Sequence, residues 1–246
     1  MSWTRRSVLA GLGGLAAPAW ALGEASQVDV VELALPTSVS RPNAWRRLLY
    51  ELQQSTSVET ADRAPLLSPD DFDLFDHPFA VLAGAKAFAP LSDAAVEQLR
   101  RYLDYGGFLY VDDTSGLVSS PFAESVARLS LRLFPTRVLA PLSANHSIFR
   151  AFFLNPACVG RVATQPYLEG IELGTVTPFV FGRNDLSGAL DRSPTGRDLH
   201  ECTPGGEWQR TEAVKLGINL VMYALTSNYK YDQAHTKQLI EEGRLE

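Results

Sequence analysis

One strand–helix–strand pattern in the middle of this 246-residue chain constrains its fold more than any other feature. Residues 79–83 (FAVLA) form an uninterrupted apolar run, which is typical of a strand buried on both faces. Ser92 can cap a helix over residues 93–103, which two glycines end, and residues 108–111 (FLYV) predict a second strand. A strand, a helix and a strand in this order indicate a parallel sheet covered by helices on both faces. We therefore expect a three-layer α/β fold with a mostly parallel sheet.

Further elements can be assigned on both sides of this unit. Residues 28–35 are rich in β-branched side chains and predict a first strand, and Pro42 begins an amphipathic helix. Ser68 is the expected cap of another helix, whose first turn is acidic. The remaining expected elements are a helix over 121–133, strands at 171–173 and 178–181, and a helix over 208–226.

These elements place one domain over residues 27–226 and leave two unusual segments. Residues 186–207 are polar and contain Gly and Pro, so we expect a long loop or flap, and loops of that length in a compact domain are usually functional. Residues 227–246 form a charged C-terminal tail that is expected to run over the surface. The tail either folds back over the strand ends, presents a partner-binding surface or is a solvated extension.

The N-terminus has the pattern of an export signal. Arg5 and Arg6 precede a Gly/Ala-rich apolar run, and Ala19-Trp20-Ala21 fits a signal-peptidase site, so the segment resembles a twin-arginine (Tat) signal. The apolar run is shorter than the roughly 20 residues that a spanning helix needs. We expect residues 1–21 to be a Tat signal peptide, with an uncleaved anchor as the alternative. The mature protein would then be periplasmic or secreted, without a membrane span.

Charge and cysteine content restrict the partners. The chain carries a net charge of −6, and loss of the two arginines of the signal, which contains no acids, takes it to −8. An acidic protein is poorly suited to nucleic acid or anionic lipid, which need a basic surface. Cys158 and Cys202 can form one disulfide in an oxidising compartment or remain separate thiols, and their spacing matches no zinc motif. The chain also has no phosphate-binding glycine motif, and we expect no cofactor.

Five motifs, taken in order, resemble one bacterial family. They are residues 106–113 (GGFLYVDD), 146–149 (HSIF), 184–190 (NDLSGAL), 216–226 (LGINLVMYALT) and 228–235 (NYKYDQAH). On these motifs the chain is identified as a member of domain-of-unknown-function family 4159, within the class I glutamine-amidotransferase-like superfamily. The resemblance implies a flavodoxin-like or amidotransferase-like three-layer α/β fold. Related domains are fused to membrane proteins of the aerotolerance type, which implies a role in cell-envelope assembly.

The turn after the second strand departs from that of true amidotransferases. Those enzymes place a cysteine in a Gly-x-Cys-x-Gly elbow, whereas residues 112–116 read Asp-Asp-Thr-Ser-Gly. No Gly-x-Ser-x-Gly elbow is present to expose a serine nucleophile either. A glutaminase reaction is therefore not expected. Enzymatic activity of another kind stays open, although the missing nucleophile favours a protein that is not an enzyme.

Candidate binding residues gather where strands are expected to end. Ligands of open α/β sheets bind at the carboxyl ends of the strands, and acidic and amide side chains follow two of them here. The alternative for each is a structural one, as a helix cap, an Asx turn or a packed histidine. We expect no metal-ligating residues. The nine candidate binding residues are Asp112, Asp113, Thr114, His146, Asn184, Asp185, Tyr229, Asp232 and His235.

Three functions fit this pattern. The favoured one is a non-catalytic periplasmic binding or scaffold domain, which holds a protein partner of the cell envelope or a small ligand in the strand-end crevice. The alternative is a metal-assisted hydrolase that uses Asp112, Asp113, His146 and Asp185, and it requires these four side chains to surround one point. A third is a purely structural subunit, which would expose a large apolar patch.

Overall fold

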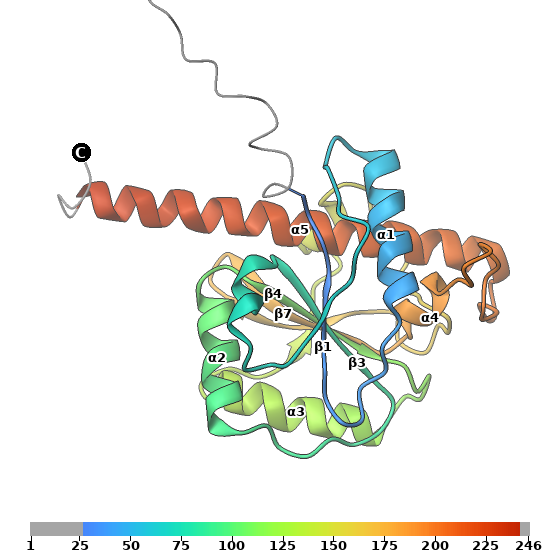
Figure 1. Cartoon of the computed structure of the whole chain (residues 1–246), viewed down its shortest axis with the longest axis horizontal. Helices are drawn as coiled ribbons and strands as arrows, with labels where there is room; N and C mark the ends of the chain where they lie inside the picture. Colours follow the sequence, from blue (N-terminus) through green and yellow to red (C-terminus); the bar gives the residue numbers. More distant parts are fainter. Residues whose placement is uncertain (1–26, 242–246) are drawn as a thin grey trace, which may run out of the picture.

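The computed structural model describes residues 27–241, with side chains described for residues 27–227. The predicted signal peptide therefore lies outside the described residues. Figure 1 shows helices packed around one central sheet. In chain order the elements are β1 (Val31–Leu33), α1 (Pro42–Ser55), β2 (Leu66–Leu67), the 3₁₀ helix η2 (Phe72–Asp76), β3 (Phe79–Gly84), α2 (Asp93–Asp104), β4 (Phe108–Asp113), α3 (Pro121–Leu133), β5 (Ala140–Pro141), the 3₁₀ helix η3 (Ser147–Arg150), β6 (Glu169–Leu173), β7 (Val176–Gly182), α4 (Leu186–Leu190) and α5 (Gly206–Glu241).

The sheet has seven strands in the order β2-β1-β3-β4-β7-β6-β5. The pairs from β2 to β7 are parallel, whereas β6 pairs with β7 and β5 with β6 in antiparallel fashion. The predicted α/β class with a mostly parallel sheet is thus confirmed, and the order matches that of flavodoxin-like folds. Strand β2 lies on one side of β1, and β3 lies on the other side of β1. The direction in which successive strands are added to the sheet therefore reverses between β1 and β3.

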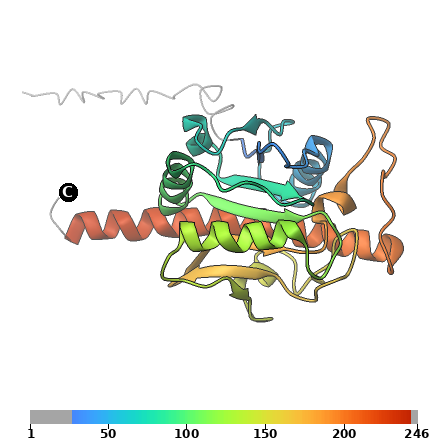
Figure 2. The same cartoon turned by 90° about the horizontal axis from the view of Figure 1, so that it is seen from below.

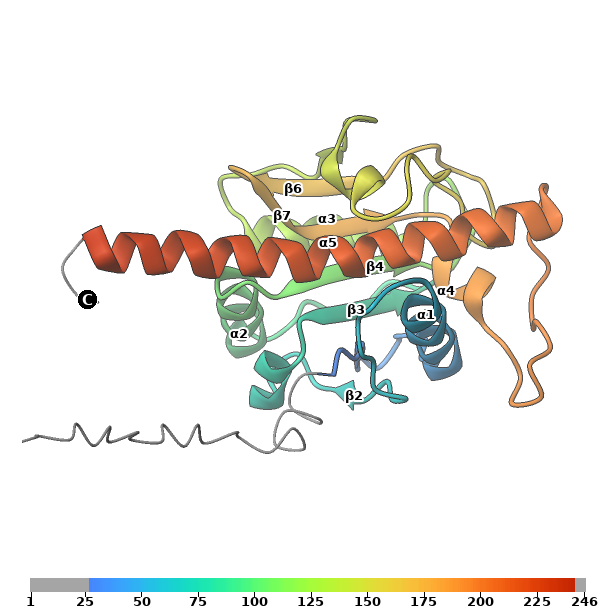
Figure 3. The same ribbon diagram turned by 90° about the horizontal axis from the view of Figure 1, so that it is seen from above.

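The sheet separates two hydrophobic cores. Helices α1, α4 and α5 cover one face, and helices α2 and α3 cover the other. Figure 2 shows the molecule with α3 in front, and Figure 3 shows it with α5 in front. Side chains of β3 alternate between the cores. Phe79 and Val81 join the first core with the buried Trp45 of α1, while Ala80 and Leu82 join the second. A strand buried on both faces needs apolar residues at every position, which explains the uninterrupted run.

The predicted strand–helix–strand unit is confirmed in detail. The Ser92 hydroxyl accepts a hydrogen bond of 3.1 Å from the Ala95 amide and caps α2. Gly106, with φ of +95°, ends the helix in the left-handed region. A Cβ on Gly107 would lie 2.4 Å from the ring of Tyr102, so only glycine lets the chain pass there. The helix predicted over residues 121–133 is also confirmed.

Several expected boundaries are wrong. The first strand covers only Val31–Leu33 of the expected 28–35, because Val28 forms an isolated bridge with Thr60 instead. The helix expected at Ser68 is the shorter η2, and Asp71 caps it by accepting from the Asp73 amide. The strands expected at 171–173 and 178–181 form a hairpin, which makes this part of the sheet antiparallel.

The expected flap and tail are corrected as well. The first part of the segment 186–207 is α4, whose five residues are all buried between α1 and α5, so the loop proper is confined to residues 191–205. The apolar residues of α4 pack into the core. Their burial makes this part of the segment helical, although the residues that follow it in the sequence are polar. The tail does not leave the helix at residue 226, because α5 continues to Glu241 and projects past the sheet in Figures 1 and 3.

Candidate functional site

The adjacent parallel strands β4 and β7 bring five candidate residues to one edge of the sheet. Asp112 is in register with Gly182, so the residues that follow both strands lie at the same carboxyl edge. The Asp185 amide donates to the Asp113 carbonyl oxygen over 3.1 Å and joins the two turns. Thr114 and Asn184 complete this group, and all five residues are buried. The expected convergence of the two strand ends is therefore present.

Asp185 is the centre of this group. It has φ of +54°, in the left-handed region that aspartate tolerates better than most residues, and its side chain is fully buried. Its carboxylate accepts from the Gly188 amide at 3.0 Å, from Arg41 Nη1 at 2.5 Å and from Arg161 Nε. Arg41 also donates to the Ser187 hydroxyl. Two guanidinium groups and a helix N-terminus thus compensate one buried charge.

Asp112 is held against the same helix start. Its two carboxylate oxygens accept from the Leu186 and Ser187 amides at 2.9 and 2.8 Å. Burial, followed by the charge of the nearby Asp185, raises the pKa of Asp112 to about 6. Burial and the charge of Asp112 also raise the pKa of Tyr110 well above its ordinary value. The carboxylate therefore serves as a cap for α4 within a dry environment.

Asp113 and Thr114 belong to the turn that leads into α3. Asp113 accepts from the Ser115 amide at 2.9 Å and from the Ser120 hydroxyl at 2.5 Å, and Ser120 in turn caps α3. The Thr114 amide donates to the carbonyl oxygen of Gly84, which ties the turn to β3. These contacts agree with the structural alternative for both residues, an Asx turn and a cap.

Asn184 fastens a neighbouring loop. Its side-chain oxygen accepts from the Thr164 and Gln165 amides, and its nitrogen donates to the Cys158 and Gln165 carbonyl oxygens. A Cβ on Gly160 would lie 2.1 Å from the Asn184 carbonyl oxygen, so the loop passes very close to the strand end. All the hydrogen-bonding capacity of the amide is used inside the protein. Asn184 therefore orders residues 158–165 along the site.

His146 lies at the opposite edge of the sheet. Its Nε2 is 3.0 Å from the Thr177 hydroxyl, and its Nδ1 accepts from the Ile148 amide at the start of η3. Burial lowers the pKa of His146. Thr177 precedes Gly182 by five residues in β7, a span of about 17 Å at about 3.3 Å per residue. The four residues required for the hydrolase do not surround one point, and we do not carry that alternative forward.

The remaining candidate binding residues and the two cysteines form no further site among the described side chains. Tyr229, Asp232 and His235 lie in the backbone of α5, but their side chains are outside the described residues. Among the described residues, no group of three or more His, Cys, Asp or Glu side chains is arranged to hold a metal ion. Cys158 and Cys202 are both free thiols. Burial raises the pKa of Cys158 to about 11 and raises that of Cys202, so neither is an activated nucleophile.

A hollow to which no sequence motif pointed opens at the carboxyl ends of β1, β2 and β3. Its volume is about 400 Å³, and its walls are residues 34–37, 68–70 and 88–92, which follow the three strands, with the first turn of α2. The Val39 amide donates to the Ala83 carbonyl oxygen and ties the loop after β1 to the end of β3. Each loop contributes one proline to the wall, Pro36, Pro69 and Pro90, and proline after a strand is the signal that the sequence offered.

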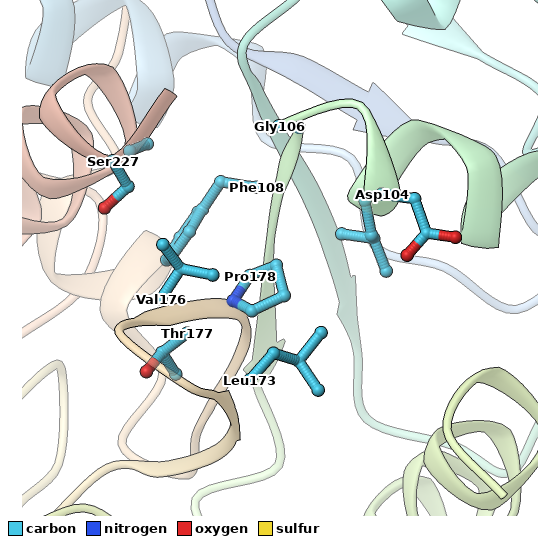
Figure 4. A pocket seen from close by; sticks show the side chains of 11 residues that line it. Asp104, Gly106, Phe108, Leu173, Val176, Thr177, Pro178 and Ser227 are labelled. Atoms are coloured by element: carbon cyan, nitrogen blue, oxygen red, sulfur yellow. The ribbon is translucent and has the colours of Figure 1, made fainter. Parts of the chain in front are cut away.

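A second pocket, of about 240 Å³, opens at the opposite edge and is mostly apolar. Figure 4 shows Phe108 of β4, Val176 and Pro178 of β7 and Ser227 of α5 around it. Asp104, at the end of α2, is the acidic side chain on its rim. The molecule thus has hollows at both ends of its strands, whereas the sequence directed attention to the carboxyl end alone.

Comparison with known proteins gives a family without an assigned activity. The family described as Domain of unknown function (DUF4159) matches residues 31–225, from β1 through the packed part of α5. No curated protein matches the chain. Within residues 27–241, none of the helices combines the length and the apolar character that crossing a membrane requires. Because the match covers most of the sequence and all of the sheet, the chain belongs to the DUF4159 family.

Proposed function

We propose that this protein is a non-catalytic binding module, which holds a partner protein of the cell envelope or a small ligand in the hollow at the carboxyl ends of β1, β2 and β3. The observation that carries the proposal is the position of this hollow. It lies beside the point where the strand order reverses, the usual ligand position in open α/β sheets. Its volume of about 400 Å³ falls within the range of small-molecule sites.

The polar residues of the neighbouring edge support binding over catalysis. The carboxylates of Asp112, Asp113 and Asp185 are engaged by backbone amides, hydroxyl groups and arginines of this chain. The Ser115 hydroxyl is a possible nucleophile in the turn after β4, and it accepts from the Leu117 amide. None of its hydrogen bonds among the described residues is made with a histidine, which would be needed to activate it. These groups hold the loops in place, and the hollow beside them remains open. Membership in the amidotransferase-like superfamily is part of this proposal, with the fold retained and the nucleophile lost.

The walls of the hollow indicate the chemistry of its occupant. They are mainly proline, leucine, alanine and the ring of Phe88, and the polar groups come from Thr37, Ser68, Asp70 and Ser92. Sites for small molecules and side-chain anchors commonly combine an apolar lining with a few polar groups that fix orientation. The favoured occupant is therefore an apolar group with one hydrogen-bond donor, carried by a small molecule or by an extended segment of a partner.

A pair of alanines in one loop tests the site. Ala89 lines the hollow, Ala87 does not, and both are exposed, so tryptophan at either position spares the core. A photo-crosslinking amino acid at position 89 should capture a defined protein or adduct in cells, and the same group at position 87 should not. Ala89→Trp should abolish that product and Ala87→Trp should retain it. Equal crosslinking from both positions, or a product unaffected by Ala89→Trp, would contradict the proposal.

Export by the Tat route is the second part of the proposal. Its support is the twin-arginine pattern at Arg5 and Arg6 and the small-residue site at 19–21. Residues 1–26 fused to a folded fluorescent reporter should direct it across the inner membrane. Replacing both arginines by lysine should retain the reporter in the cytoplasm. Export of the doubly substituted fusion at the original level would remove this part of the proposal and leave the binding site untouched.

A further inference from the structure

A buried acid–histidine pair lies at the amino edge of the sheet, away from the site described above. Asp29 and His77 precede β1 and β3, and both are nine-tenths or more buried. His77 Nδ1 is 2.5 Å from Asp29 Oδ1, and Arg63 Nε donates to Asp29 Oδ2 over 2.8 Å. Burial acts to raise the pKa of Asp29, but the hydrogen bonds from His77 and Arg63 outweigh it, and the pKa is lowered. Asp29 is therefore a carboxylate.

The pair fixes the direction of the imidazole. Because Nδ1 faces a carboxylate, it carries the proton in the neutral ring, and Nε2 then presents a lone pair. In the part of the chain with described side chains, Nε2 has no hydrogen-bond partner, and it is not among the enclosed polar atoms. His77 lines a pocket of about 290 Å³. Nε2 is thus an accessible, unpartnered atom of a residue that lines this pocket.

The walls of this pocket are unusually aromatic. The ring of Phe75 meets Tyr102 and Tyr105 edge-on, with centroids 6.2 and 6.1 Å apart. The Tyr102 hydroxyl donates to the His77 carbonyl oxygen over 2.9 Å, which fixes the backbone behind the imidazole. Tyr105 remains 66% exposed, so a large aromatic surface borders the opening. The exposed ring is accessible to a ligand that enters the pocket.

The charge of the pocket has one sign. Asp76 lies on its wall, and the residues within 27–227 that line it include neither lysine nor arginine. The apolar pocket of Figure 4 shares Gly107 with it and carries Asp104, and its described lining residues likewise include no lysine or arginine. The Arg63 guanidinium is directed to Asp29 and does not line the pocket. This edge of the molecule therefore combines carboxylates, aromatic faces and an imidazole acceptor.

We propose that this pocket binds an organic cation, an ammonium or a guanidinium group. The faces of Phe75 and Tyr105 attract the cation through their ring quadrupoles, and Asp76 supplies the opposite charge. Nε2 of His77 accepts one N–H of the cation. The same chemistry serves a free amine and the lysine or arginine side chain of a partner, and the experiment separates the two sources.

The test uses four probes on the full mature protein at one fixed pH. The probes are butylammonium, butylguanidinium, neutral butyramide and the capped peptide acetyl-Gly-Arg-Gly-amide, and binding is followed by NMR of the histidine rings. The cations should shift the His77 signals saturably, with a Kd of about 1 mM or tighter, and butyramide should not. Tighter binding of the peptide than of butylguanidinium identifies a partner's side chain as the source, and tighter binding of the free cations identifies a small amine.

Exposed variants keep the test independent of folding. Tyr105→Ala and Asp76→Asn remove one wall and the countercharge, and each should weaken cation binding about fivefold or more. Asp73→Asn, on the same 3₁₀ helix but outside the pocket, and Tyr50→Ala, an exposed tyrosine on α1, should leave the Kd unchanged. Equal binding of butyramide, or an unchanged Kd in Asp76→Asn and Tyr105→Ala, overturns the proposal.

Discussion

At the scale of single residues, ionisation of the buried Asp112 side chain lowers the stability of the folded protein. Its pKa is about 6 in the folded protein and 3.8 as the ordinary value. The folded state therefore binds more protons than the unfolded state between these values, and the contribution of Asp112 to stability falls as the pH rises from about 4 to about 6. The contribution is fully present below the ordinary pKa.

Asp112→Asn removes this titration. The free energy of unfolding of the variant, measured by chemical denaturation, should gain on that of the wild type as the pH rises from about 4 to about 6. Asp29, whose lowered pKa gives the opposite slope, is present in both proteins and cancels in the difference. Parallel stability curves for the two proteins would show that Asp112 is ionised throughout.

Asp185 is the second residue with a measurable role. Asp185→Asn keeps a side chain that tolerates the left-handed backbone and can still cap α4, but it removes the buried anion that Arg41 and Arg161 share and leaves Arg41 only the more distant Asp191, at 4.0 Å. Breaking a buried ion pair typically costs 3–5 kcal/mol, and the partial exposure of both arginines favours about 3 kcal/mol here. Asp62→Asn, in the exposed pair with Arg46, is the control and should change the free energy of unfolding by about 0.5 kcal/mol or less. If the two substitutions changed the free energy of unfolding equally, the ion pairs of Asp185 with Arg41 and Arg161 would have no structural role.

At the scale of elements, Ser92 and Ser68 were both expected to cap helices, but only Ser92 does so. Ser92 accepts from the Ala95 amide and begins a twelve-residue helix, whereas the Ser68 hydroxyl donates to the Asp70 carboxylate at the surface and caps no helix. Ser92→Ala should lower the free energy of unfolding by about 1 kcal/mol, and Ser68→Ala by clearly less. Thermal and urea unfolding of the two variants compares them directly. A larger loss for Ser68→Ala would restore the helix expected there from the sequence.

At the scale of the whole molecule, the C-terminal helix divides into a packed part and a projecting part. The last hydrophobic residue packed against the described core is Leu225, and α5 runs on past the sheet to Glu241 (Figure 3). A chain that ends at Ser227 should therefore unfold with a midpoint close to that of the full protein, since its core is retained. If the projecting part is a partner-binding surface, the truncated chain keeps its stability and loses partner capture. A large drop in the midpoint would place a missing stabilising contact in residues 228–246.

The sequence by itself determined the elements whose signals are local. The apolar runs of β3 and β4, the cap at Ser92 and the glycine turn before Phe108 act over a few residues, and each was predicted with nearly correct bounds. The meeting of Asp112 and Asp185 also followed, because parallel neighbouring strands end at the same edge. These are consequences of periodicity and steric preference, which a short stretch of chain contains in full.

Only the tertiary structure decided the rest, because it depends on partners far away in the chain. Asp185 finds Arg41 across 144 residues, and His146 is drawn to Thr177 at the opposite edge, which no local pattern reveals. The hollow at the carboxyl ends of β1, β2 and β3 arises from three loops that meet only when β1 lies between β2 and β3. Pairing of distant segments is selected by burial of the whole core, so side chains with the same local pattern become caps, ion pairs or open acceptors according to what the fold places beside them.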